Sequence, residues 1–199
     1  MPDLWLIENE IYEEGFQLLC GVDEAGRGPL AGPVCAAACI LPRGEEIPGL
    51  NDSKKLSEKK REELYDVITE KAVTFGIAFA SVEEIEAMNI LNATYLAMNR
   101  AIEMLEPIPE LALIDGNRNQ AIRIPSRCIV KGDAQCADIA AASVLAKVTR
   151  DRYMLDLAEQ YPQYAFEKHK GYGTALHYSA LREYGPSPVH RMSFLKKLH

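Results

Sequence analysis

Residues 21–34 read GVDEAGRGPLAGPV, and the apolar residues LLC come directly before them. An apolar run of this kind predicts a buried strand over residues 18–23. The strand ends on two adjacent acids, Asp23 and Glu24, and a glycine–arginine–glycine turn follows them. Glycine lets a backbone approach another group closely, because no Cβ intervenes. The stretch therefore predicts a strand end that places acids beside accessible backbone.

Two further acids follow predicted strands in the same way. Asp115 comes after the apolar residues LALI at 111–114, and Asp133 follows a strand predicted over residues 128–130. Each acid alone is typical of a turn, but strand ends in an α/β sheet are where functional sites are usually built. Four carboxylates in one place need protons or a counter-charge, and oxygen-only ligands favour Mg²⁺ or Mn²⁺ over zinc. Two such ions can clamp the attacking and leaving oxygens of a phosphodiester, with water as the nucleophile.

The rest of the chain predicts an α/β fold with a helical end. Further strands are expected over residues 34–41 and 73–80. Helices are expected over residues 58–71, from the capping box of Ser81 and Glu84, over 92–105, over 137 to about 160, around 174–184 and over 193–198. This order predicts a mixed sheet of about five strands flanked by helices. We place a catalytic core at residues 1–160 and a small C-terminal helical segment at 161–199, which packs on the core and contributes to substrate binding.

Composition excludes several classes of protein. The 199 residues are 48% hydrophobic, which is ordinary for a chain with a full core. No apolar run is long enough to span a bilayer, and the N-terminus lacks the basic start of a signal peptide. The five cysteines form no C-x-x-C pair, which argues against a cysteine-based metal site. We therefore expect a cytoplasmic protein with no membrane partner.

The charge is unevenly distributed. The chain carries a formal net charge of −7, which argues against a nucleic-acid partner. Residues 147–199, however, contain nine Lys/Arg and five Asp/Glu, a net charge of +4, together with all four histidines. Such a segment is often only a solvated surface, and it favours nucleic acid only if its basic face borders the acids.

Six ordered motifs resemble those of bacterial ribonuclease HII. They are GVDEAGRGPLAGPV, NDSKKLS, LIDGN, VKGDA, AAASVLAKVTRDR and HKGYGTALH followed by GP and HRMSF, and they extend from residue 21 to residue 194. The resemblance implies a ribonuclease H-like fold and Mg²⁺ or Mn²⁺ as cofactor. It implies cleavage of RNA in RNA–DNA hybrids and of single ribonucleotides embedded in duplex DNA, leaving 3′-hydroxyl and 5′-phosphate ends.

The resemblance also implies roles for particular residues. The family's metal-holding carboxylates fall on the four acids already singled out, and its glycine–arginine–glycine motif, which contacts the ribonucleotide 2′-hydroxyl, falls on Gly26, Arg27 and Gly28. Its tyrosine, which stacks on the neighbouring deoxyribose, falls on Tyr172. The 2′-hydroxyl is the group that distinguishes RNA from DNA.

The basic residues are weaker candidates for phosphate contacts. These candidates are Lys54 and Lys55 before a predicted helix, Ser143 and Lys147 on one helix face with Arg150, and Lys170 beside Tyr172. Ser143 fits equally well as a small packing residue in an alanine-rich stretch. His169, His177 and His190 fit structural roles better than acid–base roles.

Two other functions stay open at this point. A nuclease of the same fold could act on a different nucleic-acid structure, or the chain could be a non-catalytic hybrid-binding module. The tail SFLKKLH carries no clear clamp-binding motif, so the sequence identifies no protein partner, and we expect a monomer.

Overall fold

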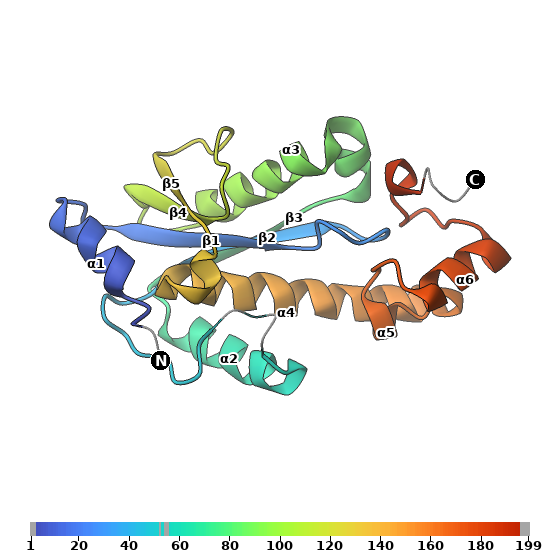
Figure 1. Ribbon diagram of the computed structural model, residues 1–199, viewed down its shortest axis with the longest axis horizontal. Helices are drawn as coiled ribbons and strands as arrows, with labels where there is room; N and C mark the ends of the chain where they lie inside the picture. The colour runs from blue at the N-terminus through green and yellow to red at the C-terminus, as the bar shows by residue number, and fades with distance from the viewer. Residues whose placement is uncertain (1–2, 52, 54–55, 196–199) are drawn as a thin grey trace.

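A five-stranded mixed sheet forms the centre of the protein (Figure 1). The computed structural model describes residues 3–51, 53 and 56–195. In spatial order β3-β2-β1-β4-β5, the strands are β3 Thr74–Ala80, β2 Val34–Ile40, β1 Leu19–Ala25, β4 Leu111–Asp115 and β5 Ser126–Ile129. The β1–β2 and β2–β3 pairs are antiparallel, whereas β1–β4 and β4–β5 are parallel. The predicted α/β class and mixed sheet are confirmed.

Helices cover both faces of this sheet. Figure 1 shows α3 (Val82–Glu103) on one face, and α4 (Ala137–Gln160) with α2 (Glu58–Lys71) on the other. The start of α4 lies very close to β1, since a Cβ added to Gly21 would sit 2.1 Å from the backbone of Asp138. The alanine-rich start of α4 permits this approach, as predicted from its small side chains. The helix is thereby fixed against the strand that carries Asp23.

The C-terminal segment packs on the far end of α4. It contains α5 (Phe166–His169), α6 (Ala175–Tyr184) and a 3-10 turn at Met192–Phe194. Its side chains form a hydrophobic cluster with Met154 of α4 and with Leu30 and Ala31 of the loop after β1. The segment therefore contacts the loop that follows the first pair of acids.

Helix α1 (Leu6–Glu13) precedes β1 in a segment for which no element was predicted, and the two helices expected on either side of residue 90 are present within α3, separated by the non-helical Asn89. Two local predictions were wrong. Strand β5 begins at Ser126 rather than residue 128, because it is a half-buried edge strand without the expected apolar run. The helix expected over residues 193–198 is a 3-10 turn where the structure describes it, and its last three residues lie outside the described part. No helix in the described part is long and apolar enough to cross a membrane.

Candidate active site

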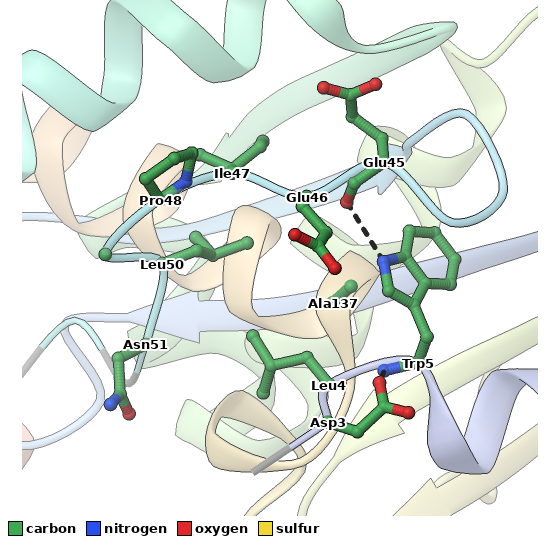
Figure 2. Close-up of a pocket in the computed structure, with 11 residues that line it drawn as sticks. Asp3, Leu4, Trp5, Glu45, Glu46, Ile47, Pro48, Leu50, Asn51 and Ala137 are labelled. Atoms are coloured by element: carbon green, nitrogen blue, oxygen red, sulfur yellow. Dashed lines mark hydrogen bonds between the residues drawn. The ribbon is translucent and has the colours of Figure 1, made fainter. Parts of the chain in front are cut away.

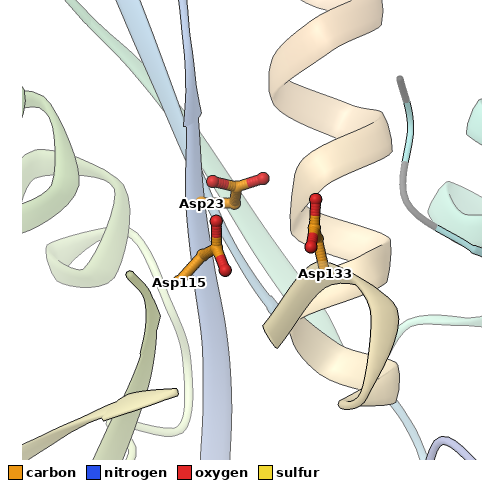
Figure 3. A group of neighbouring side chains, drawn as sticks. All are labelled: Asp23, Asp115 and Asp133. Atoms are coloured by element: carbon orange, nitrogen blue, oxygen red, sulfur yellow. The ribbon is translucent and has the colours of Figure 1, made fainter. Parts of the chain in front are cut away.

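Three aspartates from separate parts of the chain meet at one edge of the sheet (Figure 3). Asp23 lies near the end of β1, and Asp115 ends the neighbouring parallel strand β4, one residue after the pair Val22 and Ile114. Asp133 lies in the 3-10 turn Gly132–Ala134, which precedes α4. Each side chain offers a carboxylate oxygen, and these oxygens lie within 4.8 Å of one another. The predicted convergence of the strand ends is confirmed for these three acids.

Backbone amides hold the aspartates in this arrangement. The amide of Glu24 donates to Oδ1 of Asp23 at 2.7 Å, and the amide of Gly132 donates to Oδ1 of Asp115 at 2.7 Å. The bond from Gly132 to Asp115 connects the end of β4 to the turn that contains Asp133. Asp133 lies three residues before Cys136, the N-cap of α4.

The electrostatics of the group favour a bound cation. Burial raises the pKa of Asp23 well above its ordinary value, and the negative charges of Glu24 and Asp115 raise it further. Carboxylates this close cannot all stay ionised without a counter-charge. A donor set made only of carboxylate oxygens suits a hard divalent ion such as Mg²⁺ or Mn²⁺. The residues present therefore fit the predicted metal.

Glu24 lies beside this group rather than within it. Its Oε1 accepts from Nη1 of Arg27 at 3.1 Å, and its charge acts on Asp23. Glu24, Arg27 and Asp115 line one cavity of about 360 Å³ together with Tyr95 and Arg118. The fourth predicted carboxylate thus faces the space next to the three aspartates.

The glycine–arginine–glycine loop borders the same site. Gly26 is buried with φ +95°, and a Cβ there would lie 1.9 Å from Nε of Arg150, so only glycine fits. Arg27 and Gly28 are exposed. Tyr172 is 44% exposed, and its Cε1 lies 3.7 Å from the position of a Cβ on Gly28. The structure therefore brings together residues 26–28, the reader loop predicted to contact the 2′-hydroxyl, and the tyrosine predicted to stack on the neighbouring sugar.

The basic candidates differ in their surroundings. Lys147 donates to Asp151 at 2.7 Å, and Lys170 donates to the carbonyl of Glu167 at 2.6 Å. Ser143 is buried, its hydroxyl lies 2.7 Å from that of Ser53, and it offsets part of the rise in the pKa of Asp23. The phosphate contacts of these residues stay predictions, as do those of Lys54 and Lys55, which lie outside the described residues.

The three histidines of the C-terminal motifs have structural surroundings. His169, His177 and His190 are buried around Phe166, and Nε2 of His177 lies 3.0 Å from Nε2 of His190. Burial lowers the pKa of each ring, to about 4 for His190. Neutral rings packed in this way agree with the interpretation made from the sequence.

Two arginines of the basic segment have a role that the sequence did not suggest. Arg150 and Arg191 are buried and donate to backbone carbonyls of the loop after β1. Arg150 shares a helix face with Ser143 and Lys147, but that face points into the protein. Nothing in the local pattern around either arginine separates a buried donor from a surface cation, so only the tertiary structure identifies them.

A second cavity, of about 470 Å³, lies between the N-terminal segment and the loop after β2 (Figure 2). Trp5 closes one side, where its Nε1 donates to the carbonyl of Glu45 at 3.0 Å. Its lining includes Leu4, Leu50 and Ala137 but none of the predicted site residues. It offers no chemistry comparable to that of the three aspartates.

Known proteins are similar to this chain in sequence and in fold. The family model described as Ribonuclease HII matches residues 20–197. A ribonuclease HII of Acetivibrio thermocellus is 51% identical over 194 residues, covering 98% of this chain and 76% of that protein. One of Dechloromonas aromatica is 58% identical over 177 residues, covering 89% of this chain and 90% of that protein. A solved structure of a PCNA:RNase HII complex from Archaeoglobus fulgidus matches with a TM-score of 0.75 and 25% identity, covering 90% of this chain and 95% of that chain.

Proposed function

Because this chain belongs to the ribonuclease HII family of metal-dependent endoribonucleases, we propose that it cleaves the RNA strand of RNA–DNA hybrids and also incises duplex DNA at single embedded ribonucleotides. The observation that carries the proposal is the group of three aspartates, of which Asp115 lines one cavity with Arg27 of the exposed loop residues Arg27 and Gly28. The aspartates suit metal ions that act on a phosphodiester, and the loop suits a sugar hydroxyl.

In this proposal, Asp23, Glu24, Asp115 and Asp133 hold two divalent ions, Mg²⁺ or Mn²⁺. When bound, such ions lower the pKa of a water nucleophile and neutralise the charge that develops on the phosphate. The protein's own contribution is to fix the carboxylates through the amides of Glu24 and Gly132. Attack by water then leaves a 3′-hydroxyl and a 5′-phosphate.

Recognition of the ribonucleotide belongs to the neighbouring loop. The backbone groups of Gly26, Arg27 and Gly28 contact the 2′-hydroxyl, and Tyr172 stacks on the deoxyribose that follows. A site that hydrogen-bonds a hydroxyl rejects the analogue without it by about 10⁴–10⁵. The position of Tyr172 beside Gly28 supports one continuous reading surface.

The test uses a labelled DNA duplex with one embedded ribonucleotide, incubated with and without Mg²⁺, followed by analysis of the product ends. We expect incision only with the metal, and a 5′-phosphate on the downstream product. Asp115→Asn should lower the rate by about a hundredfold or more. A nuclease for another nucleic-acid structure predicts no incision of this duplex, and a hybrid-binding module predicts binding without products.

A further inference from the structure

Two buried guanidinium groups hold the loop that follows β1. Arg191, in the C-terminal segment, donates from Nε to the carbonyl of Gly32 at 2.9 Å, from Nη1 to that of Arg27 at 3.0 Å, and from Nη2 to that of Gly26 at 2.7 Å. Its side chain is fully buried. The bonding partners are carbonyl oxygens rather than carboxylates, so the guanidinium orients peptide groups instead of balancing a charge.

Fixing these two carbonyls also fixes the direction of the next two amides. In a planar trans peptide the carbonyl oxygen and the following N–H point in opposite directions. With the oxygens of Gly26 and Arg27 directed at the buried guanidinium, the N–H groups of Arg27 and Gly28 are directed away from it. Both residues are exposed, and within the part of the chain that the structure describes neither amide donates to an acceptor.

We propose that Arg191 is a positioning residue for ribonucleotide selection: it holds the loop so that the amides of Arg27 and Gly28 face the 2′-hydroxyl. The inference rests on the proposed function, because it takes the loop to be the reader of that hydroxyl. An amide N–H donates to a hydroxyl oxygen, and deoxyribose offers no such acceptor. Arg191 itself does not contact the substrate.

The chemistry of this position requires an arginine. A guanidinium presents five donors in a rigid planar fork, whereas the ammonium of lysine is a single flexible point. Burial lowers the pKa of Arg191 to about 9, which still leaves the group charged near neutral pH. All three carbonyls therefore keep their donors under ordinary conditions.

Arg150 provides a matched control in the same interior. It donates to the carbonyls of Pro33 at 3.0 Å, Lys170 at 3.1 Å and Ala31 at 3.1 Å. It is buried like Arg191 and packs against Gly26 of the same loop, but it donates to neither of the carbonyls at positions 26 and 27. Replacing it should cost stability without turning the two reader amides.

The experiment compares wild type, Arg191→Lys and Arg150→Lys. Binding is measured by fluorescence anisotropy to two DNA duplexes that differ in one 2′-hydroxyl, with Ca²⁺ in place of Mg²⁺ and product formation monitored. We expect wild type to prefer the ribonucleotide duplex. Arg191→Lys should reduce that preference by about tenfold, with its affinity for the all-DNA duplex unchanged. Arg150→Lys should keep the preference for the ribonucleotide duplex, even if its thermal unfolding midpoint falls as far as that of Arg191→Lys.

The outcomes distinguish the role of the loop from the role of Arg191. A wild type that binds both duplexes equally would remove the loop's proposed role in reading the 2′-hydroxyl. A wild type with the preference and a folded Arg191→Lys that retains it would overturn the role of Arg191 alone. An equal loss in both variants would also overturn it, because the effect would then be general loosening of the loop.

A measurement on wild type covers the case in which Arg191→Lys does not fold. In ¹⁵N-labelled protein, the ribonucleotide duplex should shift the amide signals of Arg27 and Gly28 more than the all-DNA duplex does. The Nε–H of Arg191 should stay protected from solvent exchange in both complexes. Loss of that protection on binding the ribonucleotide duplex would show that the carbonyls are released, which contradicts the inference.

Discussion

The hydroxyl oxygens of Ser53 and Ser143 lie 2.7 Å apart in the protein interior, so one of the two donates to the other. Ser143 also offsets part of the rise in the pKa of the buried Asp23 carboxyl. The pair connects the NDSKKLS block to α4 next to the buried aspartate. Ser143 therefore has a partner inside the protein whether or not it also meets a phosphate.

Ser143→Ala should weaken the response to metal more than it weakens substrate binding. Without the hydroxyl, Asp23 loses a neighbour that favours its ionised form, and Ser53 loses its hydrogen-bond partner. We expect the Mg²⁺ concentration needed for half-maximal incision to rise several-fold, which a metal titration measures. Exposed Ser179 on α6 gives the control, Ser179→Ala. An unchanged metal titration with weaker substrate binding would favour the phosphate contact instead.

Asp23→Asn should stabilise the metal-free protein while abolishing its activity. The substitution removes one buried charge from a group of like charges, so the free energy of unfolding without divalent ions should rise by about 1 kcal/mol at pH 8. Stabilisation by added Mg²⁺ should disappear, since binding to the folded state alone raises stability. Thermal unfolding measures both effects, with Asp156→Asn on the exposed side of α4 as the control. A destabilised variant that still responds to Mg²⁺ would argue against the metal site.

Tyr172→Ala should slow incision at ribonucleotide–deoxyribonucleotide junctions by about tenfold, because stacking on a flat ring contributes on this scale. Tyr172→Phe keeps the ring and should retain most of the rate. Tyr184, which is 53% exposed on α6, provides Tyr184→Ala as a control for the loss of a surface aromatic side chain. Equal single-turnover rates for Tyr172→Ala and wild type would contradict a stacking role.

Salt should weaken substrate binding, but less than the basic segment's composition suggests. Each phosphate contact contributes about 0.9 to the slope of log affinity against log salt. Of the nine Lys/Arg in residues 147–199, Arg150 and Arg191 are buried, and Lys147 is paired with Asp151. We therefore expect a slope clearly shallower than nine contacts would give, measured by anisotropy over a salt series. A flat response would leave the basic segment without a role in binding.

Glu8→Gln should flatten the dependence of stability on pH. Glu8 is buried beside Asp138, and burial raises its pKa to about 7. The folded state therefore holds a proton that the unfolded state releases near pH 4.5, so wild-type stability falls as pH rises between these values. Glutamine carries no charge to bury, and at pH 8 the variant should be more stable by roughly 2–3 kcal/mol. Parallel curves of stability against pH for wild type and Glu8→Gln would contradict this expectation. Glu10 is exposed on the same helix, so Glu10→Gln is the control and should leave the curve unchanged.

The sequence predicted the parts of the site that depend on local pattern. Asp23 and Asp115 follow apolar strands, and a parallel pair of strands necessarily brings its two ends together. The close approach of backbone expected around Gly26 is observed, and the group next to it is the side chain of Arg150. These features are visible in a few neighbouring residues.

The parts that were missed depend on contacts between distant segments. Helix α1 is only eight residues long, and the amide of Asp138 at the start of α4 donates to its buried Glu8. Arg191 resembles any basic residue of a charged tail until the carbonyls of residues 26 and 27 are placed next to it. Ser143 lies in an alanine-rich helix, where its link to Asp23 has no sequence signal.

The bonds from Arg191 to the loop after β1 join positions more than 160 residues apart, which has a consequence during synthesis. On a translating ribosome, the sheet and all three aspartates emerge well before the residue that orients the reader loop. If the proposed role of Arg191 holds, chains stalled or clipped ahead of residue 191 contain all three aspartates but lack the donor to these two carbonyls, so they should be the least discriminating forms of the protein.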